Sequence, residues 1–110
     1  MSTERFADLS IVIPAAGKGE RLALGPKALL EIEGRSLLRW LSAKACAVSP
    51  EVIVAVPPGC VTEWSSHCPG CRLIEGGDTH LASMTRLIEA ATLPWLMNLN
   101  VAMPFASIGL

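Results

Sequence analysis

Residues 9–22 read LSIVIPAAGKGERL, an apolar run that ends at a proline and leads into a loop of small residues with two glycines. The run Leu9–Ile13 is rich in β-branched residues, which is typical of a strand buried on both faces of a parallel sheet. Val52–Val56 has the same character and is also followed by proline. These two segments predict the central strands of the fold.

The segment between the two strands has helical spacing. Ser36 precedes apolar residues at positions 37, 38, 41, 45 and 48, and Pro50 follows them. A serine before the first apolar residue and a proline after the last are typical helix boundaries. The three segments together predict a β-α-β unit.

A second round of elements follows the proline pair at 57–58. After a poorly patterned stretch we expect a short strand near Arg72–Ile74 and then a helix that reaches about Ala91, capped by Asp78 or Thr79. One face of this helix is predicted to carry the apolar residues Leu81, Met84, Leu87 and Ile88. Leu93–Leu99 is interpreted as a fourth strand, with Pro94 near its start.

Strands that alternate with helices at this spacing predict the α/β class, as a three-layer α/β/α Rossmann-like fold with a mostly parallel sheet. Residues 1–110 are interpreted as part of one domain, because no repeat or linker divides them. Such sheets bind ligands at the carboxyl ends of their strands. The segments to inspect are therefore 14–27, 75–83 and 100–105.

Composition narrows the class of protein. With 51% hydrophobic and 17% charged residues, the chain can build a buried core. The net charge of −1 gives no basic footprint for nucleic acid. The apolar runs fall far short of the roughly 20 residues that cross a bilayer, and the N-terminus lacks a signal-peptide pattern. We expect a cytoplasmic protein that binds neither membranes nor nucleic acid.

Four cysteines leave alternatives open. Cys68 and Cys71 have the two-residue spacing of a zinc knuckle or redox pair, and Cys60 is a possible further ligand. A second such pair is absent, and Pro-Gly between the two thiols also suits a plain turn before a strand. We favour the turn, and we expect His67 and His80 to have structural or solvent-facing roles.

The loop after the first strand has the composition of an anion site. Gly17 and Gly19 allow backbone amides to approach phosphates closely. Arg21 and Lys27 add two cations beside them, which nucleotidyl transfer needs in order to stabilise developing charge. The pattern is neither a Walker A loop nor G-x-G-x-x-G, and we predict phosphate binding here.

These motifs resemble the 2-C-methyl-D-erythritol 4-phosphate cytidylyltransferase family. The similarity covers Pro-Ala-Ala-Gly-x-Gly-x-Arg-Leu at 14–22, Pro-Lys at 26–27, Gly-Arg-x-Leu-Leu at 34–38 and Val-Pro-Pro at 56–58. It continues through Glu75-Gly76-Gly77-Asp78-Thr79 with Ser83, and through Pro-Phe at 104–105. Sugar nucleotidyltransferases and molybdenum-cofactor guanylyltransferases share the first loop and remain alternatives.

The resemblance implies transfer of CMP from CTP to 2-C-methyl-D-erythritol 4-phosphate, with Mg²⁺ as cofactor and a homodimer as the assembly. It implies that this chain is the N-terminal half of the family fold. Arg21 and Lys27 would be catalytic. The nucleotide would contact Pro14, Ala15, Ala16, Gly17, Gly19, Gly77, Asp78, Ser83 and Val101.

The third strand exit departs from the family pattern. Asn100 stands where the family has an aspartate that helps to hold magnesium, and Met103 replaces an arginine. An amide oxygen is a poorer ligand than a carboxylate for a hard dication. A degenerate, non-catalytic nucleotide-binding module is therefore the second hypothesis.

Overall fold

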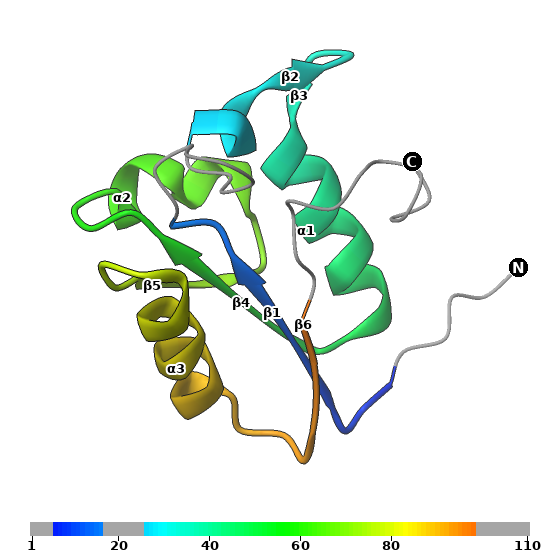
Figure 1. The fold of residues 1–110 in the computed structure, drawn as a ribbon. Helices are drawn as coiled ribbons and strands as arrows, with labels where there is room; N and C mark the ends of the chain where they lie inside the picture. Colours follow the sequence, from blue (N-terminus) through cyan, green and yellow to red (C-terminus); the bar gives the residue numbers. More distant parts are fainter. Residues whose placement is uncertain (1–5, 17–25, 99–110) are drawn as a thin grey trace, which may run out of the picture.

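The centre of the molecule is a four-stranded parallel sheet, seen in a computed structural model that describes residues 6–16 and 26–98. The strands are β1 (Leu9–Pro14), β4 (Glu51–Val56), β5 (Arg72–Glu75) and β6 (Trp95–Asn98). Their order is β5-β4-β1-β6, so β1 lies between β4 and β6 (Figure 1). All four predicted strands are confirmed, and all three pairings are parallel.

The two predicted helices are confirmed as α1 (Leu37–Val48) and α3 (His80–Ala90). Ser36 caps α1, because its hydroxyl accepts a hydrogen bond from the Arg39 N–H at 3.1 Å. Of the two candidate caps of α3, Thr79 is the one used, and its hydroxyl accepts from the Ala82 N–H at 3.0 Å. Both caps satisfy amides that have no partner within the helix.

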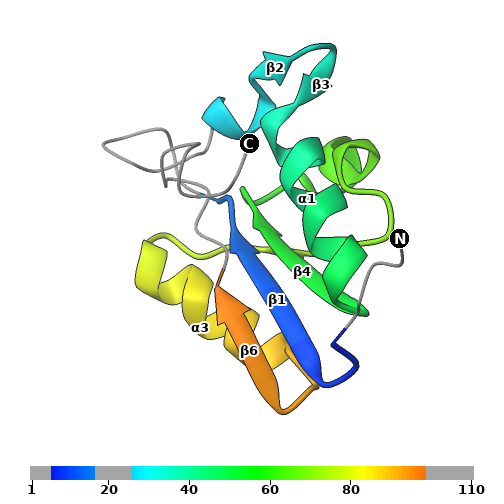
Figure 2. The same cartoon turned by 90° about the vertical axis from the view of Figure 1, so that its right-hand side faces the viewer.

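Helices cover both faces of the sheet. Alternate residues of β1 and β4, such as Ile13 and Val54, pack with α1 and with Trp64 of the short helix α2 (Val61–Trp64). The residues between them, such as Val12 and Ile53, pack with Leu87 of α3. Figures 1 and 2 show α1 and α3 on opposite sides of the sheet. The predicted three-layer α/β/α arrangement is therefore observed.

Two further features were not predicted. A two-stranded hairpin joins β2 (Glu31–Ile32) to β3 (Arg35–Ser36), following a 3-10 turn at Pro26–Leu29. Its two loop residues, Glu33 and Gly34, have φ values of 53° and 83°, the left-handed conformation of the tight turns that suit hairpins. The poorly patterned stretch contains α2 and a 3-10 turn at Ser65–His67, and it buries Trp64 and Cys68.

The expected apolar face of α3 was wrong in part. Leu87 is buried and Met84 is half-buried, but Leu81 and Ile88 are 75% and 53% exposed. The helix instead turns Ser83 and Leu87 towards the sheet. A small residue at position 83 lets the helix lie close to the segment that follows β5, which rotates Leu81 and Ile88 outward.

The amino ends of the strands are joined through Glu51. Its carboxylate accepts hydrogen bonds from the Ser10 hydroxyl and from the backbone N–H and the hydroxyl of Thr92, the latter two at 2.9 and 2.8 Å. Burial raises the pKa of this carboxyl group, but these hydrogen bonds and the charge of Arg72 outweigh burial. The pKa of Glu51 therefore lies below its ordinary value of 4.5.

Replacing Glu51 with glutamine should lower the free energy of unfolding by about 1–2 kcal/mol at neutral pH, because glutamine keeps one accepting oxygen instead of two and loses the negative charge that strengthens these bonds. Since folding lowers the pKa of Glu51, its carboxylate stabilises the fold above about pH 4.5, and that stabilisation is lost as the pH falls through the folded pKa. Urea unfolding at neutral pH and near pH 3 should show the difference between the two proteins shrinking.

The exposed Glu89 of α3 offers a matched control for this experiment. Glu89→Gln should change the free energy of unfolding little at either pH. A Glu51→Gln difference that stayed constant between the two pH values would contradict the role given to its carboxylate.

Candidate functional site

The predicted site residues that the structure describes lie where β1 and β5 end. Beyond Pro14, the backbone N–H of Ala15 donates to the carbonyl of Ala55 at 2.9 Å. Beyond β5, the N–H of Gly76 donates to the carbonyl of Val56 at 2.8 Å. Both strand exits are therefore held on the end of β4, although β1 and β5 are not neighbours in the sheet.

Gly76 brings the two exits into direct contact. A Cβ atom added to Gly76 would lie 2.2 Å from the Cβ of Ala16 and 2.7 Å from the hydroxyl of Ser83. No side chain fits in that space, so glycine is required at this position. The contact places Ala16, Gly76 and Ser83 together, and thereby unites two of the segments that the sequence analysis singled out.

Ser83 fixes the backbone of the second exit. It lies on the first turn of α3 and is buried, and its hydroxyl accepts a hydrogen bond from the N–H of Gly77 at 3.0 Å. A Cβ atom on Gly77 would lie 2.4 Å from that of Ala82, so this glycine is also packed against the helix. A hydroxyl that accepts one bond keeps its own hydrogen to donate. Ser83 can therefore hold Gly77 and still donate to a ligand.

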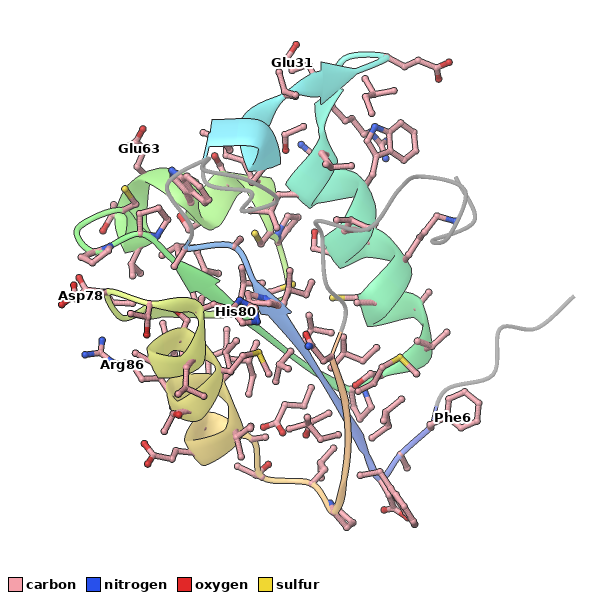
Figure 3. All side chains as sticks on the ribbon, in the orientation of Figure 1. Phe6, Glu31, Glu63, Asp78, His80 and Arg86 are labelled. Atoms are coloured by element: carbon pink, nitrogen blue, oxygen red, sulfur yellow. The ribbon has the colours of Figure 1, made fainter. Side chains whose placement is uncertain are left out.

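Asp78 lies at the exposed tip of the same loop. Figure 3 shows it at the outer end of the loop that leads into α3, with Arg86 below it on the helix. Because Thr79 supplies the cap, the carboxylate of Asp78 is not used to start the helix. His80 is the first residue of α3 and is exposed, as expected for a solvent-facing role.

Arg86 is a residue of the site that the sequence did not point to. One guanidinium nitrogen, Nη1, donates to the carbonyl of Glu75 and to that of Gly76, each at 3.2 Å. Ser83 and Arg86 are three residues apart on α3, so both face the loop from one side of the helix. Together they hold the peptide between Gly76 and Gly77 through its carbonyl and its N–H.

Several predicted site residues lie outside the described part of the chain. These are Gly17, Gly19 and Arg21 in the first loop, and Asn100 and Val101 after β6. Lys27 belongs to the 3-10 turn Pro26–Leu29, and the structure describes only its backbone. The catalytic and magnesium assignments stay predictions.

The described residues do not form a metal-binding site. Residues 6–16 and 26–98 contain no group of three or more His, Cys, Asp or Glu side chains that could hold a metal ion. Burial raises the pKa of the Cys68 thiol to about 12 and raises that of Cys71 as well. Thiols in such surroundings are protonated at neutral pH and are poor metal ligands.

His67 has a structural role, as expected. Its Nδ1 lies 2.9 Å from the hydroxyl of Ser36, the residue that caps α1. This contact joins the 3-10 turn at Ser65–His67 to the start of α1.

Among the described residues, no helix has the length and apolar character that would let it cross a bilayer.

Comparison with known proteins identifies relatives over most of this chain. The family described as MobA-like NTP transferase domain matches residues 11–110. The 2-C-methyl-D-erythritol 4-phosphate cytidylyltransferase of Thermus thermophilus is 48% identical over 103 residues, which cover 94% of this chain and 46% of that protein. The enzyme of the same name from Deinococcus radiodurans is 43% identical over 94 residues, covering 86% of this chain and 39% of that one.

The solved structures agree. The crystal structure of the Thermus thermophilus enzyme superposes with a TM-score of 0.66 and 43% identity, covering 87% of this chain and 42% of that one. The chain thus spans less than half the length of the relatives that it matches.

Replacing Arg86 with methionine should loosen the loop before α3, because the aliphatic stem is kept while both hydrogen bonds to the loop are lost. We expect amide hydrogen exchange at Gly76 and Gly77 to become about 5 to 10 times faster, measured by NMR. Arg72→Met is a matched control, since Arg72 also donates to a backbone carbonyl, that of Ala90 at the far end of α3. Equal effects of both variants on the two glycines would contradict the role of Arg86.

Proposed function

This chain belongs to the MobA-like NTP transferase domain family, and from that premise we propose that it is the nucleotide-binding part of a 2-C-methyl-D-erythritol 4-phosphate cytidylyltransferase. The proposed reaction transfers CMP from CTP to 2-C-methyl-D-erythritol 4-phosphate and releases pyrophosphate. Identity of 48% to an enzyme of that name supports the choice of substrate pair within the family.

The proposal rests on the meeting of two strand exits at the carboxyl end of the sheet. Ala15–Ala16 and Gly76–Ser83 come together at the carboxyl ends of β1 and β5, where open α/β sheets bind their ligands. Their backbones are held by hydrogen bonds and by packing that admits no side chain at Gly76. A preorganised backbone of this kind suits a flat, polar ligand such as a nucleotide base.

The geometry also favours one way of reading the base. The N–H of Gly77 is already bonded to Ser83, so within the described part of the chain the Gly77 carbonyl and the Ser83 hydroxyl hydrogen are left for a ligand. A carbonyl can accept from the amino group of cytosine, whereas uracil has an acceptor at the same position. We propose that Gly77, Asp78 and Ser83 select cytosine in this way.

The positive charge that stabilises the phosphates would come from the first loop. In the proposed step, a phosphate oxygen of the second substrate attacks the α-phosphorus of CTP, and the bond to the pyrophosphate oxygen breaks. Arg21 and Lys27 would stabilise the charge that develops on the leaving group, while Gly17 and Gly19 would offer backbone amides. Pro14 would end the strand so that this loop starts at the sheet edge, and Val101 would contact the nucleotide from the third exit.

Magnesium remains an expectation from the family. The described residues offer no cluster of carboxylates to hold the ion, and the residue at the family's ligand position is Asn100. The exchange of aspartate for asparagine favours a second candidate, a nucleotide-binding module that has lost catalysis.

We expect CTP to bind more tightly than UTP, ATP and GTP in isothermal titration. Lys27→Ala should weaken CTP binding about 10-fold or more, the usual effect of losing a hydrogen bond to a charged group. Lys44→Ala is the control, because Lys44 is exposed on α1 and takes no part in the proposed site. Equal heats for all four nucleotides would remove the claim of cytosine selectivity.

Asn100→Asp separates the two candidates. If the site is a damaged enzyme site, a carboxylate at position 100 should increase CTP affinity in the presence of Mg²⁺ and leave it unchanged in EDTA. The measurement is CTP titration of both proteins with and without Mg²⁺. No gain with Mg²⁺ would favour the non-catalytic module.

A further inference from the structure

Two cysteines that are far apart in the sequence meet between α1 and β5. Cys46 lies on α1 and Cys71 directly precedes β5, and their Sγ atoms are 3.7 Å apart. Both side chains are half-buried, whereas Cys68 is buried. The spacing of Cys68 and Cys71 draws attention to that pair, but the sulfur contact of Cys71 is made with a residue 25 positions earlier.

The turn before β5 explains why the two sulfurs meet. The N–H of Cys71 donates to the carbonyl of Cys68 at 3.1 Å, which closes the turn. Gly70, within this turn, has a φ of 86°, a conformation that favours glycine. A Cβ atom on Gly70 would lie 3.7 Å from the Cys46 sulfur, so the turn backbone itself packs against that thiol.

Rigid elements hold both partners in place. Ala45, the neighbour of Cys46, is buried in the core on one face of the sheet. Arg72, the neighbour of Cys71, pairs with Ile53 of β4. The two thiols are therefore carried by elements that are fixed to the same sheet.

We propose that Cys46 and Cys71 form an oxidation site, at which a small-molecule disulfide converts the two thiols into a bond that joins α1 to the start of β5. A disulfide requires a sulfur separation of about 2.05 Å. The sulfurs must approach by about 1.7 Å from their 3.7 Å contact for the bond to form.

The chemistry is a two-step thiol exchange. Cys46, as thiolate, attacks the small disulfide and releases one small thiol, which leaves a mixed disulfide on the Cys46 sulfur. The second cysteine loses its proton to solvent and attacks the protein sulfur of that mixed disulfide, releasing the second small thiol. The protein pair is oxidised by two electrons, and the oxidant is reduced to two thiols.

The bond would constrain a substantial part of the fold. It would close the stretch from 46 to 71, which contains β4 and α2. A cross-link of this length stabilises mainly by restricting the unfolded chain. The site is separate from the proposed nucleotide site, so the inference holds or fails independently of CTP binding.

The test is to treat the folded chain with oxidised glutathione and to map the product by mass spectrometry. Trypsin is unsuitable, since no lysine or arginine lies between Lys44 and Arg72 and all four cysteines stay in one peptide. Cleavage after glutamates 33, 51, 63 and 75 separates Cys46 from Cys60 and from the peptide that holds Cys68 and Cys71. We expect a monomer that has lost two hydrogens, with peptide 34–51 linked to peptide 64–75.

Serine variants identify the partners. Cys46→Ser and Cys71→Ser should abolish the cross-link, while Cys60→Ser and Cys68→Ser should retain it. Oxidation should raise the Tm of the unsubstituted chain by about 5 °C or more, and that of Cys46→Ser should not rise. A link that includes Cys60 or Cys68, a product joined between two chains, or four thiols that stay free after oxidation would overturn the proposal.

Discussion

The absence of a side chain at Gly76 is the constraint on which the site depends. β1 and β5 are separated by β4, so their exits meet only if one of them crosses the end of β4. The hydrogen bond from Gly76 to Val56 holds the chain in that crossing. A Cβ atom on Gly76 would lie only 2.2 Å from the Cβ of Ala16. Even alanine would push the two exits apart. The same glycine therefore sets how closely α3 approaches the sheet, because a Cβ atom on Gly76 would also lie 2.7 Å from the hydroxyl of Ser83 on that helix.

The elements that the sequence predicted are those with strong local signals. β1 and β4 are apolar runs that buried strands favour, and α1 is bounded by a capping serine and a following proline. The hairpin at 31–36 was missed because Glu33-Gly34 is a weaker turn signal than Asn-Gly or Asp-Gly. The short helix at 61–64 was missed because a single turn has too few residues to show a period.

Contacts between different elements account for the rest. Nothing in the pattern of α3 tells which apolar residues face the sheet, since Leu81, Met84, Leu87 and Ile88 share a helical spacing. The choice is made by the small residues Ala82 and Ser83, which fit against Gly77 and Gly76. The contacts of Arg86 and of the Cys46 sulfur also leave no pattern in the sequence, because Arg86 bonds two backbone carbonyls and Cys46 contacts a thiol 25 residues away.

The site divides into a part shaped by the scaffold and a part that carries charge. At Ala15, Gly76 and Gly77, backbone groups are fixed by hydrogen bonds to β4 and α3. Recognition of a base through such groups depends on geometry and survives changes in surrounding side chains. Phosphate chemistry instead depends on individual ions, because one lost carboxylate or guanidinium removes a full charge from the transition state. A chain of this family can therefore keep its base site while Asn100 and Met103 stand where charged residues are expected. In the proposed function, base recognition would depend on these backbone groups, whereas catalytic activity would depend on a few charged side chains.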